Sequence, residues 1–228
     1  MQQPRKPEHV SARVVNEEAG THVISADPAE QSAAEAATRR SWREFPYYAR
    51  RYGERGWRFS LSDSGWISTL CDLPPVAARE QIRWLGGLLA SRGMPLVLLE
   101  RHLFHLHDEM LQAYPDRSAR YAALQRSAAG LREARFAQIP EEKFALLAAD
   151  FEAHVKNCPG RVVNMGTVLV GAVADELGGT AKAVETVMEW ACDEAVFSPE
   201  WISAVQDVVA AGRRSSTGNS TSPGSPVR

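Results

Sequence analysis

The sequence predicts an all-α protein: one compact bundle of about nine helices with flexible segments at both ends. Apolar residues recur every three or four positions through residues 41–212, which is the spacing of one helix face. Proline, glycine and capping residues separate these periodic stretches at short intervals. The alternating pattern of a β-strand is confined to residues 57–61. These three observations together favour helices over sheet.

Composition divides the chain into three parts. Residues 1–40 are rich in Gln, Glu, Ala, Pro and Ser without a sustained period, so we expect a flexible extension that is at most weakly helical at 28–40. Residues 41–212 form the expected helical domain. Residues 213–228 consist mainly of Ser, Gly, Pro and Arg, which predicts a flexible C-terminal tail.

The first four helices are expected at 43–58, 63–73, 76–92 and 95–114. Gly93 ends the third, and Pro95 suits the first turn of the fourth. Gly86 and Gly87 lie inside the third helix, where each glycine costs about 1 kcal/mol in helix propensity. We therefore expect another helix to approach closely at this pair. The alternative is a ligand that lies against the bare backbone.

The remaining five helices are expected at 116–137, 140–157, 162–177, 180–197 and 199–211. Asp116 can cap the first of these, and Pro140 followed by two glutamates suits the start of the next. Thr180 follows two glycines and can cap the fourth. Ser198 before Pro199 combines a capping hydroxyl with proline at the first helical position. The links are short, so neighbouring helices should pack against each other.

Charge and cysteine usage narrow the class of protein. A net charge of −2 provides no general attraction to nucleic acid or to an anionic membrane, and no stretch approaches the ~18 apolar residues of a membrane span. Cys71, Cys158 and Cys192 are far apart and lack metal-ligand spacing, which indicates reduced thiols. The N-terminus has no apolar signal segment. We expect a cytoplasmic protein without a membrane span.

Three of the six histidines lie in the expected helix 95–114. On a helix, His102, His105 and Glu109 share one polar side within about 60°. They could present three ligands to one divalent metal, and Asp150 and His154 on a later helix could complete the site. The alternative is a solvated helix face with two ordinary histidines.

A second set in this helix follows its apolar side. Glu100, His107 and Tyr114 are spaced seven residues apart and form one stripe. A histidine in apolar surroundings suits a haem iron ligand or a buried proton carrier. The alternative is a core histidine bonded to a backbone carbonyl or to a carboxylate. The apolar arc covers more than half of this helix, so we expect it to be central in the fold.

Residues 39–59, called here the Arg–aromatic segment, hold seven arginines against two glutamates, a net charge of +5. Arginine and aromatic side chains suit phosphates, carboxylates and protein interfaces. Tyr48, Tyr52 and Arg55 would share one helix face. The alternative is an amphipathic helix whose aromatic rings enter the core while its arginines pair with acids. The candidate partner-binding residues are Trp42, Tyr48, Arg51, Tyr52, Arg55 and Trp57.

No dinucleotide, phosphate-loop or nucleophile-elbow motif occurs in the chain, and Asp63, Asp72, Asp175 and Glu176 are expected to be capping or surface acids. The sequence therefore favours a non-catalytic, cytoplasmic regulatory or adaptor module. Such a module would bind another protein through the Arg–aromatic segment or sense a small molecule, and nucleic acid is not expected as a partner. The alternative is a haem- or metal-binding helical protein, a sensor or oxidoreductase that uses helix 95–114. If this alternative does not apply, no cofactor is expected.

Overall fold

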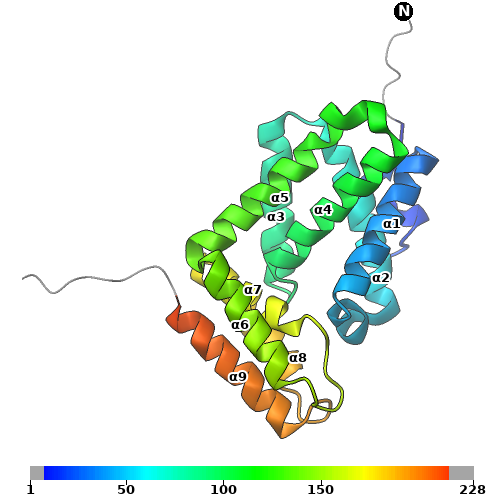
Figure 1. Ribbon diagram of the computed structural model, residues 1–228. Helices are drawn as coiled ribbons and strands as arrows, with labels where there is room; N and C mark the ends of the chain where they lie inside the picture. The colour runs from blue at the N-terminus through cyan, green and yellow to red at the C-terminus, as the bar shows by residue number, and fades with distance from the viewer. Residues whose placement is uncertain (1–7, 216–228) are drawn as a thin grey trace, which may run out of the picture.

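The computed structural model describes residues 8–215 and confirms the all-α fold class (Figure 1). Two short strands, β1 (His9–Ser11) and β2 (Val23–Ser25), form the antiparallel sheet of this range. Residues 1–7 and 216–228, which include most of the predicted C-terminal tail, lie outside it. The helices of the described range are α1 (Pro28–Glu44), α2 (Tyr47–Thr69), α3 (Pro75–Ala90), α4 (Leu96–Ala113), α5 (Ser118–Gln138), α6 (Glu141–His154), α7 (Met165–Leu177), α8 (Ala183–Ala191) and α9 (Pro199–Arg214).

Helices α3 to α9 start within three residues of the predicted positions. Capping explains the start of α9, where Ser198 Oγ accepts a hydrogen bond from the Trp201 N–H at 3.4 Å. Helix α8 ends at Ala191, six residues before its predicted end. The chain turns there because Asp193 Oδ1 accepts from the Ala195 N–H at 2.9 Å.

The predicted boundary between the first two helices is wrong. Residues 59–62 are helical within α2, and the backbone bends instead at Gly53, where φ is 54° and ψ is −155°. Glycine allows this conformation because it has no Cβ atom. Tyr48 and Tyr52 precede the bend and Arg55 follows it, so these three residues do not share one straight helix face.

The predicted flexible extension does not hold for residues 8–40, which contain both strands and most of α1. Helix α1 begins at Pro28 after Asp27, whose Oδ1 accepts from the Ala29 N–H at 2.9 Å. Ala33 and Ala37 are 5% and 0% exposed. Small alanine side chains let α1 approach its neighbours closely, so a segment of low hydrophobicity still has a buried face.

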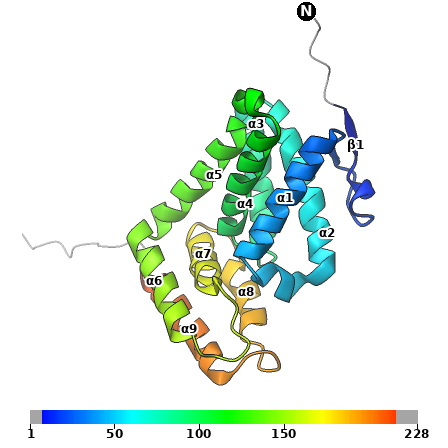
Figure 2. The ribbon, with the colours of Figure 1, turned by 45° about the vertical axis from the view of Figure 1, so that its right-hand side comes forward.

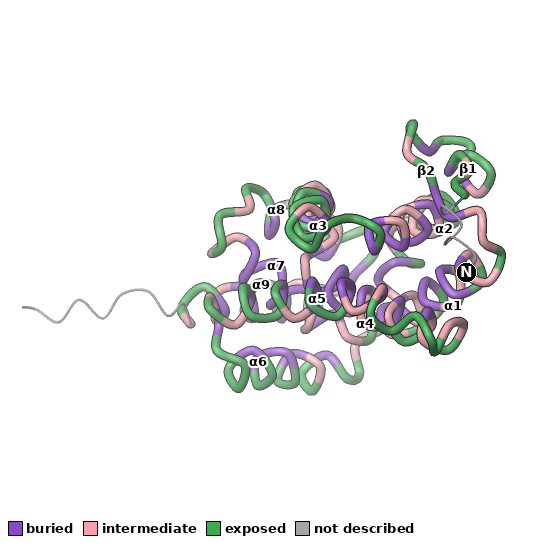
Figure 3. The backbone as a smooth tube through the Cα atoms, turned by 90° about the horizontal axis from the view of Figure 1, so that it is seen from above, coloured by how far each residue is buried: buried purple, intermediate pink, exposed green. Residues whose placement is uncertain are grey.

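Helix α4 is central, as its broad apolar arc predicts. It packs against α1, α3, α5 and α7, and it lies between α1 and α5 (Figure 2). One apolar cluster fills the space among α1 to α5 and includes Leu103 and Leu106. A second lies among α6 to α9 and extends to the starts of α2 and α4; it includes Val170 and Trp201. Exposed positions follow the outer faces of the helices, as α6 shows clearly (Figure 3).

The two glycines of α3 have different surroundings. A Cβ atom at Gly86 would lie 2.5 Å from Leu96 Cδ2 and 3.3 Å from Leu99 Cδ2, so the predicted close approach of another helix is confirmed at this position. Gly87 is exposed, and a Cβ atom there would meet nothing within 4 Å. Within residues 8–215, no helix combines the length and apolarity needed to cross a membrane.

Candidate functional site

The arginines of the Arg–aromatic segment make contacts inside the chain. Arg51 donates to the Tyr47 hydroxyl and, at 2.7 Å, to the Thr186 carbonyl. Arg55 pairs with Glu18 at 2.8 Å, although both side chains remain largely exposed. Surface pairs of this kind contribute little to stability, because solvent screens them. Partner binding by these arginines stays a prediction.

The aromatic residues of the same segment pack on one another. Trp42 in α1 stacks on Tyr48 with ring centroids 5.6 Å apart, and Trp57 meets Trp42 edge-on at 5.2 Å. The Tyr52 hydroxyl donates to the Arg92 carbonyl at 3.2 Å. The aromatic rings therefore pack α1 against α2. Tyr48 is buried, with 8% of its surface exposed.

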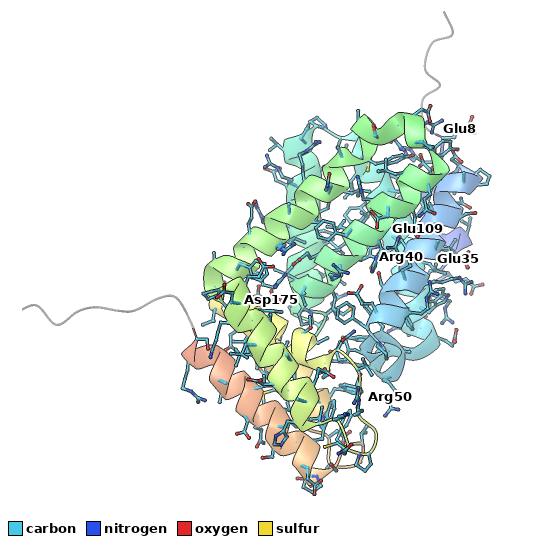
Figure 4. The ribbon with its side chains drawn as sticks, viewed as in Figure 1. Glu8, Glu35, Arg40, Arg50, Glu109 and Asp175 are labelled. Carbon is cyan, nitrogen blue, oxygen red and sulfur yellow. The ribbon has the colours of Figure 1, made fainter. Side chains whose placement is uncertain are left out.

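The predicted metal ligands on α4 have other partners. His105 Nε2 lies 2.6 Å from a carboxylate oxygen of Glu44. Glu109 accepts from Arg40 at 2.9 Å, and the two side chains face each other between α4 and α1 (Figure 4). His102 points between serine hydroxyls. The polar side of α4 is thus an interface with α1 rather than a free set of ligands.

The two remaining metal candidates lie elsewhere. Asp150 and His154 on α6 line, with Asp207 of α9, a separate surface cavity of about 210 Å³. Across residues 8–215, no group of three His, Cys, Asp or Glu side chains is arranged to hold a metal ion. The structure therefore does not assemble the five predicted ligands, because α4 uses its polar groups to bind neighbouring helices.

The side chains predicted to form a haem or buried polar site also interact with other residues of the chain. Glu100 and Arg135 form a two-pronged buried ion pair at 2.8–3.0 Å, and burial raises the pKa of Glu100 even though Arg135 opposes the shift. His107 Nδ1 lies 3.6 Å from its neighbour Asp108. The Tyr114 hydroxyl donates to Asp27 at 2.5 Å. The three side chains of the stripe have separate partners and form no common site.

A pocket of about 50 Å³ that is partly open to solvent, called here the inner pocket, lies among α1, α2, α3 and α4. It combines Trp42 and Tyr48 from the Arg–aromatic segment with His102 from the predicted metal set. The other polar residues that line it are Thr38, Ser41, Ser60, Asp63 and Ser64. The apolar ones are Ile67, Leu85, Leu89, Met94, Leu98 and Leu99.

His102 is held neutral between two serine hydroxyls. Its Nδ1 lies 3.0 Å from Ser41 Oγ, and its Nε2 lies 3.1 Å from Ser64 Oγ. The Ser41 hydroxyl donates to the Ala37 carbonyl and the Ser64 hydroxyl donates to the Ala34 carbonyl, both at 3.1 Å, so either serine oxygen is available to accept the single proton of the neutral ring. Burial lowers the pKa of His102 to about 4, with the nearby His105 adding to the shift. The ring is therefore uncharged at neutral pH.

Asp63 is the pocket residue that the sequence pattern missed, since we expected a capping or surface acid there. Its carboxyl group forms no hydrogen bond or ion pair with any residue of the described range. Burial raises its pKa to about 6, and the positive charge of Arg92 opposes the shift. The available signal was its position on α2, because Ser60, Ser64 and Ile67 share its helix face.

Comparison with protein-family models, curated proteins and solved structures finds no significant match to this chain. The inner pocket is therefore interpreted from its own chemistry. The Asp63 carboxyl group has no ion pair or hydrogen bond among residues 8–215, although the charge of Arg92 acts on it from beyond ion-pair contact, and the faces of tryptophan and tyrosine attract cations. The arrangement can bind a small positively charged group.

Proposed function

We propose that the protein is a non-catalytic, cytoplasmic regulatory module that senses a small protonated amine in the inner pocket. The observation that carries this proposal is the unpaired carboxyl group of Asp63 in a cavity lined by Trp42 and Tyr48. A buried charge is stable only when it is paired. An ammonium group supplies the charge and three hydrogen-bond donors, and the aromatic faces add cation–π attraction.

The volume of the inner pocket limits what can enter it. Water occupies roughly 30 Å³ per molecule in the liquid, so about 50 Å³ accepts an ammonium head group with one or two carbon atoms. The apolar residues Leu89 and Met94 line the same cavity and suit the first carbons of an alkyl chain. The ligand class is therefore a primary alkylamine whose charged end is buried.

The chemistry of the nucleophilic side chains supports a non-catalytic role. Burial raises the pKa of Cys71 to about 12 and also raises that of Cys192, which keeps both thiols protonated and unreactive. His102, with a pKa of about 4, is a weak general base at neutral pH. Cys71, Cys158 and Cys192 are free thiols, which supports a cytoplasmic location. A partner protein that detects the bound state would complete the regulatory role.

The test measures thermal unfolding of the full chain with n-butylamine and, in parallel, with 1-butanol. Binding to the folded state at 100 times Kd adds about 2.7 kcal/mol to the free energy of unfolding. We expect the amine to raise Tm and the alcohol to leave it unchanged. Asp63→Asn should remove the effect of the amine, while Asp150→Asn, an exposed acid on α6, should retain it.

Three results would overturn the proposal: no amine effect on the wild-type chain, an equal effect of 1-butanol, or an undiminished effect in Asp63→Asn. Circular dichroism establishes that each variant is folded. A Soret band lost in His107→Ala would instead favour the haem-binding alternative. Near-stoichiometric metal that is lost when His102 and His105 are both replaced would favour the metal-binding alternative.

A further inference from the structure

A second and larger hollow lies on the other side of α3. It has a volume of about 740 Å³ and runs between α3 and α5, reaching the start of α4 and the end of α7. We call it the α3–α5 groove. Asp175, which Figure 4 labels, lies at the α7 end of the groove. The volume falls within the range of about 300–1,000 Å³ that is typical of small-molecule sites.

Small residues keep this groove open. Gly87 of α3 and Gly130 of α5 both line it and are exposed. A Cβ atom at either position would meet nothing within 4 Å, so neither glycine is required by close packing. Ile82, Leu96 and Leu131 supply apolar lining, which can cover the hydrocarbon part of a ligand.

The charged side chains that line the groove are mostly arginines. Arg79 and Arg83 of α3 and Arg126 of α5 are exposed and have no hydrogen-bond or ion-pair partner among residues 8–215. Arg135 is already paired with Glu100. Two acids also line the groove: Glu133 is exposed, and Asp175 is buried and accepts a hydrogen bond from the Leu96 N–H at 2.7 Å. Three guanidinium groups therefore remain free to bind an anion.

The Ser127 hydroxyl is an independent indication of a ligand. Ser127 lines the groove, is 5% exposed, and its Oγ atom has no hydrogen-bond partner in the described part of the chain. A buried hydroxyl without a partner is unfavourable, so native proteins rarely leave one unused. Ser127 and Arg126 both line the groove, so the unused hydroxyl and the unpaired guanidinium group border the same hollow.

We propose that the α3–α5 groove binds a small organic anion, a carboxylate or phosphate joined to an apolar chain. Arg79, Arg83 and Arg126 bind the anionic head group, and the Ser127 hydroxyl donates a hydrogen bond to it. The apolar chain covers Ile82, Leu96 and Leu131. This site has a different ligand and a different location from the inner pocket, so it stands or falls independently of the proposed amine sensor.

The test is isothermal titration of the full chain with octanoate, octyl phosphate and the neutral analogue 1-octanol. Arg126→Gln should weaken binding of the preferred anion at least tenfold. Ser127→Ala should weaken it about threefold or more while Tm stays equal or rises, since the variant also removes an unsatisfied hydroxyl. Arg43→Gln is the matched control, because Arg43 is an exposed arginine on α1, on the opposite side of α4 from α5 (Figure 1).

The proposal is supported if either anion binds the wild type and if Arg126→Gln and Ser127→Ala weaken that binding as stated. The anion that binds more tightly identifies the head group. Absence of binding by both anions would overturn the proposal, as would equal affinity for 1-octanol. It would also fail if Arg126→Gln and Ser127→Ala bind as the wild type does, or if inorganic phosphate binds as tightly as octyl phosphate. Asp63→Asn should leave anion binding unchanged, which separates this result from the amine test.

Discussion

Asp175 of α7 caps the first turn of α4, and its burial makes the charged form of its side chain unfavourable. The carboxylate accepts from the Leu96 N–H at 2.7 Å, and the residue is 4% exposed. Burial raises its pKa to about 7, although the Leu96 hydrogen bond and Arg135 oppose the shift. Asp175→Asn keeps an oxygen that can accept the same hydrogen bond and removes the ionisation.

The size of the expected stability difference follows from the raised pKa of Asp175. The folded state holds the proton of Asp175 more tightly than the unfolded chain, whose aspartates have a pKa near 3.8. The contribution of this proton binding to the free energy of unfolding is fully present below about pH 4, and it is lost as pH rises through about 7. Each pH unit within this range corresponds to about 1.4 kcal/mol. Between pH 5 and pH 8, the stability of Asp175→Asn relative to the wild type should therefore increase by about 3 kcal/mol.

Urea unfolding monitored by tryptophan fluorescence at pH 5, 6, 7 and 8 measures this difference. The other titrating groups are common to both proteins, so the difference between the two curves isolates Asp175. Asp150→Asn, on the exposed face of α6, serves as the control substitution. A constant difference between pH 5 and pH 8 for Asp175→Asn would refute the reasoning, because it would mean that the buried carboxyl group does not titrate in this range.

Two further predictions concern packing and charge inside the bundle. Glu100→Gln leaves the buried Arg135 without its counter-charge and should lower the free energy of unfolding by about 3–5 kcal/mol; a loss below 1 kcal/mol in urea titration would contradict this. Gly166→Ala places a Cβ atom 2.5 Å from the Ala148 carbonyl oxygen, so overpacking should destabilise the fold by about 1–3 kcal/mol. Gly130→Ala meets no neighbour and should instead stabilise α5 by about 0.5–1 kcal/mol, as thermal unfolding can verify.

Local chemistry explains which parts of the fold could be predicted. Proline, capping hydroxyls and glycine act within a few residues, so Pro140 and Ser198 locate the starts of α6 and α9 from sequence alone. The sequence predicts at most weak helicity at 28–40 because the buried face of α1 is rich in alanine, and Ala33 and Ala37 are recognisable as core only from the helices around them. The bend at Gly53 was missed for a related reason, since an isolated glycine in a helical pattern does not specify its own φ angle.

The candidate site was less predictable because it depends on contacts between helices that are distant in sequence. Trp42, Tyr48 and His102 were singled out by residue type, and the structure brings them into one pocket. Asp63 and Ser127 have ordinary polar neighbours in the sequence, and only tertiary burial distinguishes them from surface residues. Partners on other elements likewise engage Arg40, Arg51 and Arg55, which no local pattern could reveal.

Helix α3 lies between the inner pocket and the α3–α5 groove, for which we propose ligands of opposite charge. Leu85 and Leu89 face the inner pocket, while Ile82 and Arg83 face the α3–α5 groove. An occupant on either side that displaces this helix would alter the shape offered to the other occupant. Thermodynamic linkage makes such an effect mutual, with each occupant changing the affinity of the other by the same factor. Because α3 borders both hollows, binding of a cation in the inner pocket could in this way change the affinity of the α3–α5 groove for an anion.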